Sequence, residues 1–230
     1  METIFEGRLS SSPYIESIWR GQNGSNYAVV CPADGRWNML FTRYNGKVKL
    51  AVEGPRTRAT PKTQPEGNEF LTIVFALGTF LPNIPAGNLL DSDVFLPQAA
   101  HKSFWLDGDT WETPSFENVE TFVEHLVRND VLVADPLVKA VLQDQAPELS
   151  ERTLRRRFVQ ATGLAPNLIG QIERALQAHR LLENGAPILD AVYEAGYADQ
   201  PHLTRSLKRF IGYTPAQIAQ LERQTVTFIG

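Results

Sequence analysis

The chain has 230 residues, of which 43% are hydrophobic and 21% are charged, and its formal net charge at pH 7 is −4. This composition is typical of a folded globular protein, and the length suits one or two domains that each bury a core. The net negative charge argues against a histone-like DNA-binding protein, and the single cysteine, Cys31, excludes an internal disulfide and a multi-cysteine zinc site.

Charge is unevenly distributed along the chain. Residues 148–230 hold ten Lys and Arg against eight Asp and Glu, a net charge of +2, whereas residues 1–147 carry a net charge of −6. The sequence has no charged start followed by an apolar run and no stretch of about 18 apolar residues, so we expect neither a signal peptide nor a membrane span. A cytoplasmic protein with a modestly basic C-terminal part is therefore expected.

The first half of the chain predicts mainly β-strands. The segments rich in β-branched and aromatic residues are 26–31, 36–44 and 47–54. Asn45-Gly46, between the last two of them, is a strong hairpin signal. The polar segment 54–67 is rich in Pro and Gly and predicts a loop, as does segment 78–88, whereas the continuous apolar run 70–77 predicts a buried strand.

Residues 115–129 predict an amphipathic helix, because Val119, Phe122 and Leu126 fall at helical spacing. Two interpretations of its apolar face remain open. The helix either covers the N-terminal sheet or provides the contact surface of a homodimer. Together with the predicted strands, it indicates an α+β domain with a β-sheet over residues 1–130.

The remainder of the chain predicts helices with clear ends. Asp135 is expected to cap a helix that begins at Pro136 and is interrupted by Pro147. Ser150 is expected to cap the next helix, which ends at Gly163. A single longer helix is predicted over residues 166–184, and it would separate the helices on either side by a constant distance.

Residues 188–215 predict two short helices around a turn at Gly196. Asp199 is a good N-cap for the second helix, whose buried face is formed by Leu203, Leu207 and Phe210. The other residues of that helix are polar and mostly cationic. A helix-turn-helix with a basic second helix indicates DNA binding, and the alternative is a solvated basic face on an ordinary helix pair.

Three segments resemble the AraC-type (AraC/XylS) transcription regulators over about residues 149–218. AGYADQPHLTRSLKRFIGYTP resembles the second helix-turn-helix of that family, LSERTLRRRFVQATGLAP its first recognition helix, and QIERALQAHRLLENGAPI its linker helix. The resemblance implies an all-α DNA-binding domain over residues 131–230 with two helix-turn-helix subdomains, whose recognition helices enter successive major grooves. It also implies that residues 1–130 form a sensor or oligomerisation domain, in this family often a cupin-like barrel.

The resemblance places six residues at base- or phosphate-facing positions. They are Arg152, Arg155, Arg156, Gln200, Thr204 and Arg205. Arg suits base recognition because its planar guanidinium matches guanine O6 and N7 in a bidentate pair. Lys208 and Arg209 are expected to contact phosphates, which position a protein without specifying sequence, and Ser150 to present backbone N–H groups to a phosphate.

Three further side chains are given other roles. Arg174 matches a position that the family usually fills with Arg, and we interpret it as structural. Arg157 lies nearer the core edge and is expected to pair with a carboxylate or a phosphate. His202 is interpreted as a phosphate or intra-helix partner rather than as a metal ligand.

The first helix-turn-helix departs from the family pattern. The family normally has a further helix and a glycine-containing turn before the first recognition helix. Here only residues 135–149 precede Ser150, and that turn contains no glycine. We expect segment 135–146 to serve as the supporting helix, which leaves the contacts of the first recognition helix less defined than those of the second.

The main functional prediction is a sequence-specific transcription regulator that binds double-stranded DNA, with or without control by a small-molecule effector. Four aromatic residues either line an apolar effector pocket or pack in the core: Trp37, Phe41, Phe75 and Trp105. The alternative function is an interaction protein whose degenerate helix-turn-helix binds a partner regulator. A cupin metalloenzyme is a third class, but only His101 and His125 lie outside the DNA-binding half and they form no H-x-H pair, so we expect no enzyme and no cofactor.

Overall fold

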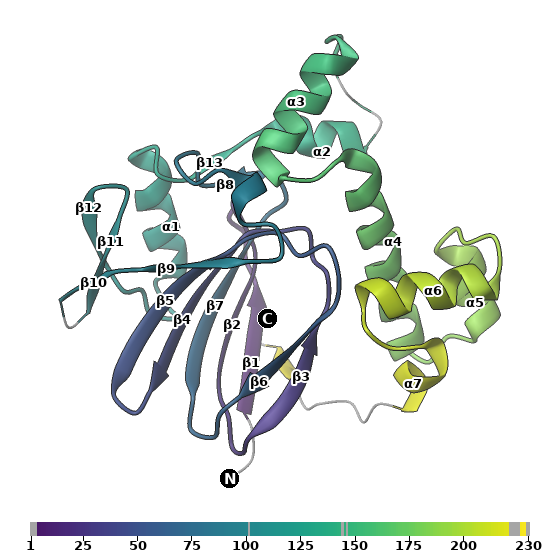
Figure 1. The fold of residues 1–230 in the computed structure, drawn as a ribbon, viewed down its shortest axis with the longest axis horizontal. Coiled ribbons are helices and arrows are strands. Elements are labelled where there is room, and N and C mark those ends of the chain that lie inside the picture. The colour runs from purple at the N-terminus through teal and green to yellow at the C-terminus, as the bar shows by residue number, and fades with distance from the viewer. Residues whose placement is uncertain (1–3, 101, 144, 146, 221–225, 229–230) are drawn as a thin grey trace.

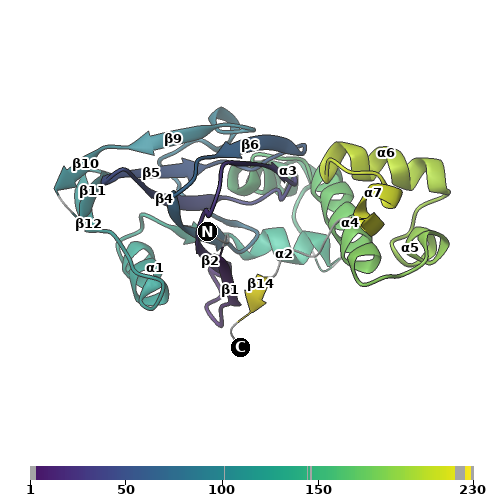
Figure 2. The ribbon, with the colours of Figure 1, turned by 90° about the horizontal axis from the view of Figure 1, so that it is seen from below.

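The computed structural model describes residues 4–100, 102–143, 145, 147–220 and 226–228. Strands dominate its N-terminal part and helices its C-terminal part, and Figure 1 shows the curved main sheet beside the group formed by helices α2 to α7. The two parts touch along one side of the sheet (Figure 2). This arrangement agrees with the predicted fold class, an α+β part with a sheet followed by an all-α part.

The main sheet has seven strands and an open order. In spatial order they are β14 (Val226–Phe228), β1 (Ile4–Leu9), β2 (Ile15–Gln22), β7 (Glu69–Phe75), β4 (Asn38–Tyr44), β5 (Lys47–Glu53) and β9 (Asp93–Leu96). Neighbours are antiparallel except β1 and β14, which are parallel. Ile18, Ile73 and Met39 are cross-strand neighbours on β2, β7 and β4, and all three are fully buried. The core of the N-terminal part therefore lies against the centre of this sheet.

The hairpin predicted at Asn45-Gly46 is confirmed. β4 and β5 pair in register from Asn38 and Glu53 to Tyr44 and Lys47, so the two turn residues lie directly between them. Asn45 has φ 50° and Gly46 has φ 72°, the left-handed values that a tight hairpin turn requires. The strands predicted over 26–31 and 70–77 are also present, as β3 (Tyr27–Cys31) and β7.

Segment 54–67 was expected to be a loop, and this prediction is wrong over part of its length. Residues Thr60–Gln64 form β6, which pairs antiparallel with β3 along the whole of that strand. The two strands form a separate ribbon, in which Pro61 lies opposite Val30. Proline is tolerated in an edge strand, and the polar sequence of β6 has no apolar alternation, so only its distant partner identifies it as a strand.

Segment 78–88, also predicted as loop, contains β8 (Thr79–Phe80) and the short 3-10 helix η1 (Ala86–Asn88). β8 pairs with β13 (Val133–Ala134), a strand more than fifty residues further along the chain. A separate three-stranded sheet consists of β10 (Gln98–Ala100), β11 (Ser103–Leu106) and β12 (Asp109–Glu112). Strands of two to four residues carry too little periodicity to be identified from sequence alone.

The amphipathic helix predicted over residues 115–129 is α1 (Val119–Arg128), and its apolar face packs on the sheets. The ring of Phe122 contacts Phe41, Phe104 and Trp111 edge-on, with centroids 6.3, 6.2 and 6.5 Å away. This packing supports the interpretation of α1 as a cover for the sheet. The exposed side chains of α1 are polar, so a homodimer through this helix, which stays a prediction, would use Glu124 or Arg128 rather than the apolar face.

Six helices follow in the C-terminal part of the described chain. They are α2 (Pro136–Leu142), α3 (Glu151–Thr162), α4 (Pro166–Glu183), α5 (Ile188–Glu194), α6 (Gln200–Phe210) and α7 (Pro215–Gln220). The predicted N-caps are confirmed, because Asp135, Ser150 and Asp199 accept hydrogen bonds from backbone N–H groups in the first turns of α2, α3 and α6. α2 is shorter than predicted. It ends at Leu142, where the Gln143 N–H caps it, well before Pro147.

One loop of the N-terminal part, residues 32–37, connects the sheet to three of these helices, and we call it the bridging loop. The Ala33 N–H donates to the Phe210 carbonyl of α6 at 2.7 Å. Trp37 Nε1 donates to the Ala161 carbonyl of α3 at 3.3 Å, and Arg36 Nη1 donates to a Glu173 carboxylate oxygen of α4 at 2.7 Å. Buried residues of both parts belong to one continuous core, so the division at residue 130 stays a prediction.

Candidate DNA-binding surface

Helix α3 presents a basic face away from the core. Phe158 and Ala161 are almost completely buried on its inner side. The residues that line an open hollow on its outer side are Glu151, Arg152, Arg155, Arg156 and Val159. Among the described residues, no carboxylate forms an ion pair with any of these three arginines. Their guanidinium groups are therefore available to an external acceptor.

Arg157, on the same helix, has a different role. Its Nε and Nη2 donate to the two carboxylate oxygens of Asp135 at 3.0 and 2.6 Å, a bidentate pair. Asp135 also caps α2 by accepting from the Leu137 N–H at 3.0 Å. This confirms the expected carboxylate partner of Arg157 and shows that α2 supports α3. The described residues between these two helices contain no further helix, in agreement with the predicted shortening of the first helix-turn-helix.

Helix α6 has the same two-sided construction. Leu203, Leu207 and Phe210 are buried on its inner face. The exposed residues predicted to meet DNA are Gln200, Arg205, Lys208 and Arg209. Thr204 is half-buried, and its hydroxyl donates to the Gln200 carbonyl at 2.9 Å, so its proton is used within the helix.

The turn before α6 is held by an aromatic contact. Tyr197 is 6% exposed, and its hydroxyl lies 2.8 Å from Ser206 Oγ. Burial raises the pKa of Tyr197 above its usual range. The His202 ring of α6 packs edge-on against the Tyr197 ring with centroids 5.0 Å apart, so the partner of His202 lies in the turn before its helix. Within the described part of the chain, no group of three His, Cys, Asp or Glu side chains is arranged to hold a metal ion. His101 lies outside the described residues.

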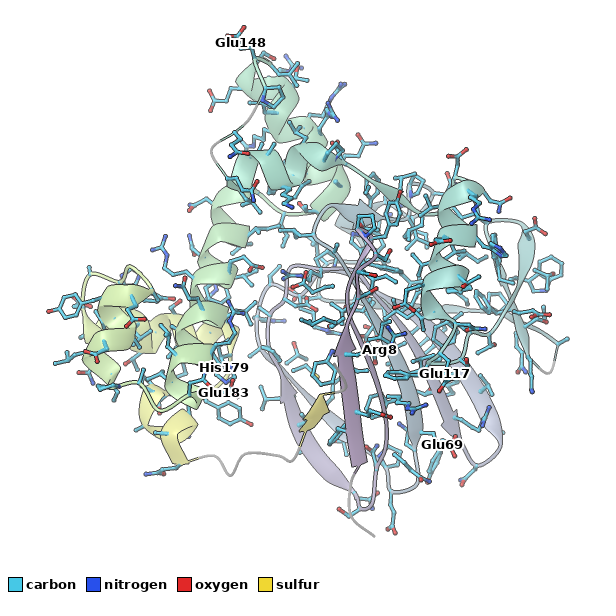
Figure 3. The ribbon with its side chains drawn as sticks, turned by 180° about the vertical axis from the view of Figure 1, so that it is seen from behind. Arg8, Glu69, Glu117, Glu148, His179 and Glu183 are labelled. Atoms are coloured by element: carbon cyan, nitrogen blue, oxygen red, sulfur yellow. The ribbon has the colours of Figure 1, made fainter. Side chains whose placement is uncertain are left out.

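Helix α4 separates the two basic helices. Its 18 residues correspond to about 27 Å. Figure 3 shows this separation, with Glu148 beside the start of α3 and with His179 and Glu183 near the far end of α4. In Figure 1, the axis of α3 runs steeply towards the top of the picture, whereas the axis of α6 runs roughly horizontally. Figure 2 also shows the two axes in different directions. The two helices are therefore held apart but not parallel.

The aromatic residues considered for an effector pocket are mostly core residues. Trp37, Phe41 and Phe75 are buried, whereas Trp105 is 48% exposed. Phe41 nevertheless also borders a hollow of 340 Å³ between the sheet and the segment that precedes α1. Its lining combines apolar side chains with two arginines: Arg20, Phe41, Thr42, Arg43, Val48, Glu69, Phe70, Leu71, Thr113, Pro114, Ser115, Phe116 and Glu117. Glu69 and Glu117 are labelled in Figure 3, and they pair with Arg43 and Arg20 respectively.

The bridging loop, which contacts α3, α4 and α6, is the feature that sequence reasoning missed. Its sequence, PADGRW, reads as an ordinary turn between two strands. Nothing local indicates that Ala33, Arg36 and Trp37 each contact a different helix of the C-terminal part. Arg36 is half-buried, and its pKa is raised by the neighbouring carboxylates, chiefly Glu173, against the opposing effect of burial.

The match to a known family lies in the C-terminal part. Residues 145–220 match the model of a family described as a helix-turn-helix domain. The HTH-type transcriptional activator RhaS of Escherichia fergusonii is 29% identical over 126 residues, which cover 53% of this chain and 42% of that protein. RhaS of Escherichia coli is 31% identical over 108 residues, covering 45% and 39%. The virulence regulon transcriptional activator VirF of Yersinia enterocolitica is 38% identical over 66 residues, covering 28% and 24%. The chain thus spans less than half the length of these relatives.

Two solved structures of ToxT from Vibrio cholerae align with most of the chain at low similarity. One has a TM-score of 0.42 and 9% identity, covering 94% of this chain and 97% of ToxT. The other has a TM-score of 0.41 and 10% identity, covering 94% and 98%.

The relatives named above are transcriptional activators. No helix in the described ranges is long and apolar enough to cross a membrane. The segment that matches the family is the one in which both capped basic helices lie. Through residues 145–220 the chain matches a helix-turn-helix domain family, and it is similar in sequence to the transcriptional activators RhaS and VirF.

Proposed function

We propose that the protein is a sequence-specific, DNA-binding transcription regulator. One observation carries this proposal. Two capped helices of one helix-turn-helix domain, α3 and α6, each bury an apolar face and expose arginines that form no ion pair with a described carboxylate. Exposed arginine on a helix that fits the major groove is the commonest means of reading guanine. The relatives named as transcriptional activators support the same function.

In the proposed mechanism, α3 and α6 enter successive major grooves on one face of the duplex. Successive turns of B-DNA are about 34 Å apart, and α4, which is about 27 Å long, lies between the two helices. Base contacts would come from Arg152, Arg155 and Arg156 on α3 and from Gln200 and Arg205 on α6. Because the two helices are not parallel in this structure, simultaneous docking requires α3 to turn relative to α6 or the DNA to bend.

Effector control is the second element of the proposal. The hollow beside Phe41 measures 340 Å³, within the range of about 300–1,000 Å³ that is usual for ligand sites. Its apolar walls and its two arginines suit a small apolar acid that competes with Glu69 or Glu117 for Arg43 or Arg20. Such an effector changes DNA binding only if its affinity differs between the DNA-competent and other conformations.

The alternative function is an interaction protein that binds a partner regulator instead of DNA. The observation that favours it is the shortened first helix-turn-helix, in which α3 is supported by α2 alone on its N-terminal side. In that case the arginines of α3 would serve only as a solvated basic face.

The test is binding of the purified full chain to fluorescent DNA enriched by random-sequence selection, across a salt series, with shuffled DNA as control. We expect a preference for the selected DNA of about a thousandfold or more. Arg205→Ala should relax discrimination at one base position by about 1–3 kcal/mol. Arg180→Ala, which removes an exposed arginine from α4, should leave discrimination unchanged. Equal, weak binding to both DNAs would contradict the regulator proposal and favour a protein partner.

A further inference from the structure

A second basic feature lies between the linker helix and the second recognition helix. It is a hollow of 170 Å³ bounded by the first half of α4 and one flank of α6, with the turn before α6 at its base. Gln171 and Arg174 line it from α4, and Arg205 and Arg209 from α6. Two of these residues, Gln171 and Arg174, are not among those that sequence reasoning assigned to DNA.

The hollow concentrates positive charge without compensation. Arg174, Arg205 and Arg209 are all exposed, and among the described residues none of them forms an ion pair. None of the described residues that line the hollow carries a carboxylate. Three guanidinium groups around one hollow repel one another, so an anion bound there would lower the free energy of the arrangement.

Aromatic rings hold two of these arginines in place. The Arg174 guanidinium lies over the buried Tyr197 ring, with its carbon 5.8 Å from the ring centroid. The Arg209 guanidinium lies over the Phe210 ring at 4.8 Å. A guanidinium stacked on a ring keeps its planar N–H donors pointing outward, and it loses less conformational entropy when it binds an anion.

The position of the hollow indicates which anion it binds. Arg205 belongs to the face of α6 that is proposed to read bases, whereas Arg174 lies on the half of α4 that is joined to α3. The hollow therefore lies beside α6, on the side of the linker that leads to α3. When two helices occupy successive major grooves on one face of a duplex, the minor groove and its two phosphate backbones pass between them.

We propose that this hollow binds a backbone phosphate of the DNA, with Arg174 of the linker helix as a direct phosphate contact. The inference rests on the proposed function and extends it, because it makes α4 part of the DNA-binding surface. The phosphate, held by Arg174 together with Arg209, sets the register of α6 in its groove, and Arg205 reads the base. Arg174, interpreted from sequence as structural, thereby gains a binding role.

The first experiment compares salt dependence among single variants. Arg174→Ala should weaken binding to selected and shuffled DNA alike, by about tenfold, and should reduce the slope of log K against log salt by about one. Arg174→Lys should restore most of the slope because it keeps the charge. Arg180→Ala is the matched control, since it removes the same charge from another face of the same helix and should leave the slope unchanged.

The second experiment separates contact from structure. Neutral methylphosphonates replace single phosphates of the selected DNA, one position at a time, between the two half-sites. We expect one position at which the substitution weakens binding of the wild-type protein but not of Arg174→Ala, because the two changes remove the same contact. Thermal unfolding of each variant checks that the exposed substitution leaves the fold intact.

The outcomes distinguish this inference from the function on which it rests. If the wild-type protein shows no preference for selected DNA, both the proposed function and the phosphate site are contradicted. If it shows the preference and Arg205→Ala reduces it, while Arg174→Ala has the wild-type salt slope, only the phosphate site is wrong. A loss of affinity in Arg174→Ala that no methylphosphonate position reproduces would also overturn the site, since Arg174 would then act only through its packing on Tyr197.

Discussion

The two recognition helices are supported differently at their N-terminal ends and similarly at their C-terminal ends. α6 follows a complete helix-turn-helix partner, α5, whereas α3 is preceded only by the short α2 and depends on the Arg157–Asp135 pair. At the other end, each helix is followed within two residues by a glycine that lies close to the N-terminal part. A side chain at Gly163 would meet Ala86 and Leu90, and one at Gly212 would meet Val30 and Ala59.

These C-terminal contacts show how the N-terminal part holds α3 and α6. Gly163 and Gly212 have φ of 71° and 92°, left-handed values that favour glycine, so both close approaches depend on it. The bridging loop contacts the same two ends through the Ala161 and Phe210 carbonyls. The N-terminal part therefore holds both helices by their C-terminal ends, which point away from the bases in the proposed mechanism. It leaves exposed the N-terminal turns, which read DNA in helix-turn-helix proteins.

The largest expected effect concerns the burial of α3. Phe158→Ala should lower the free energy of unfolding by about 3–5 kcal/mol, because Phe158 is completely buried and its truncation leaves a cavity. Val159→Ala, next to it and 38% exposed, should cost far less. Urea unfolding measures both. Similar losses in the two variants would mean that α3 is not docked on the core as described.

The next prediction compares the helix caps of the first and the second helix-turn-helix. Asp135→Ala should cost about 2 kcal/mol, because it removes both the cap of α2 and the partner of Arg157. Asp199→Ala removes only the cap of α6 and should cost about 1 kcal/mol. Denaturant unfolding of the two variants under the same conditions gives the difference. A larger loss of unfolding free energy for Asp199→Ala would contradict the idea that the first helix-turn-helix depends more on a single side chain than the second does.

A smaller effect is expected from loosening the bridging loop. Glu173→Gln weakens the pair with Arg36 that ties the loop to α4, so α3 and α6 should adjust more easily to successive grooves. Affinity for selected DNA should rise a few-fold, equivalent to less than about 1.4 kcal/mol. Glu183→Gln removes the same charge from the far end of α4 and serves as control. An equal rise in both variants would point to net charge rather than to the loop.

The smallest effect concerns Cys31, immediately before the bridging loop. Burial raises the pKa of this thiol above its ordinary value, so at a given pH the folded protein holds less of the reactive thiolate than a free cysteine does. Alkylation of the folded protein should therefore be slow, and its rate should rise at a higher pH than in urea-unfolded protein. Overlapping pH profiles for the two states would show that the end of β3 is open to solvent.

Local interactions explain which features the sequence alone determined. The caps at Asp135, Ser150 and Asp199 and the glycine at the end of α3 act within one helical turn, so their residue types suffice to predict them. The apolar faces of α1 and α6 follow from helical periodicity. The family resemblance of residues 149–218 rests on the same locally ordered segment, and it was confirmed by the match over residues 145–220.

Tertiary structure decided the features that depend on distant partners. β6 is a strand because β3 lies beside it, and the bridging loop matters because α3, α4 and α6 converge on it. Arg157 and Arg174 are both arginines on helices of the C-terminal part. Only the fold pairs the first with Asp135 and places the second beside Arg205 and Arg209. Side chains brought together across many residues leave no local pattern, because their contact energy is realised only after the chain has closed the loop between them.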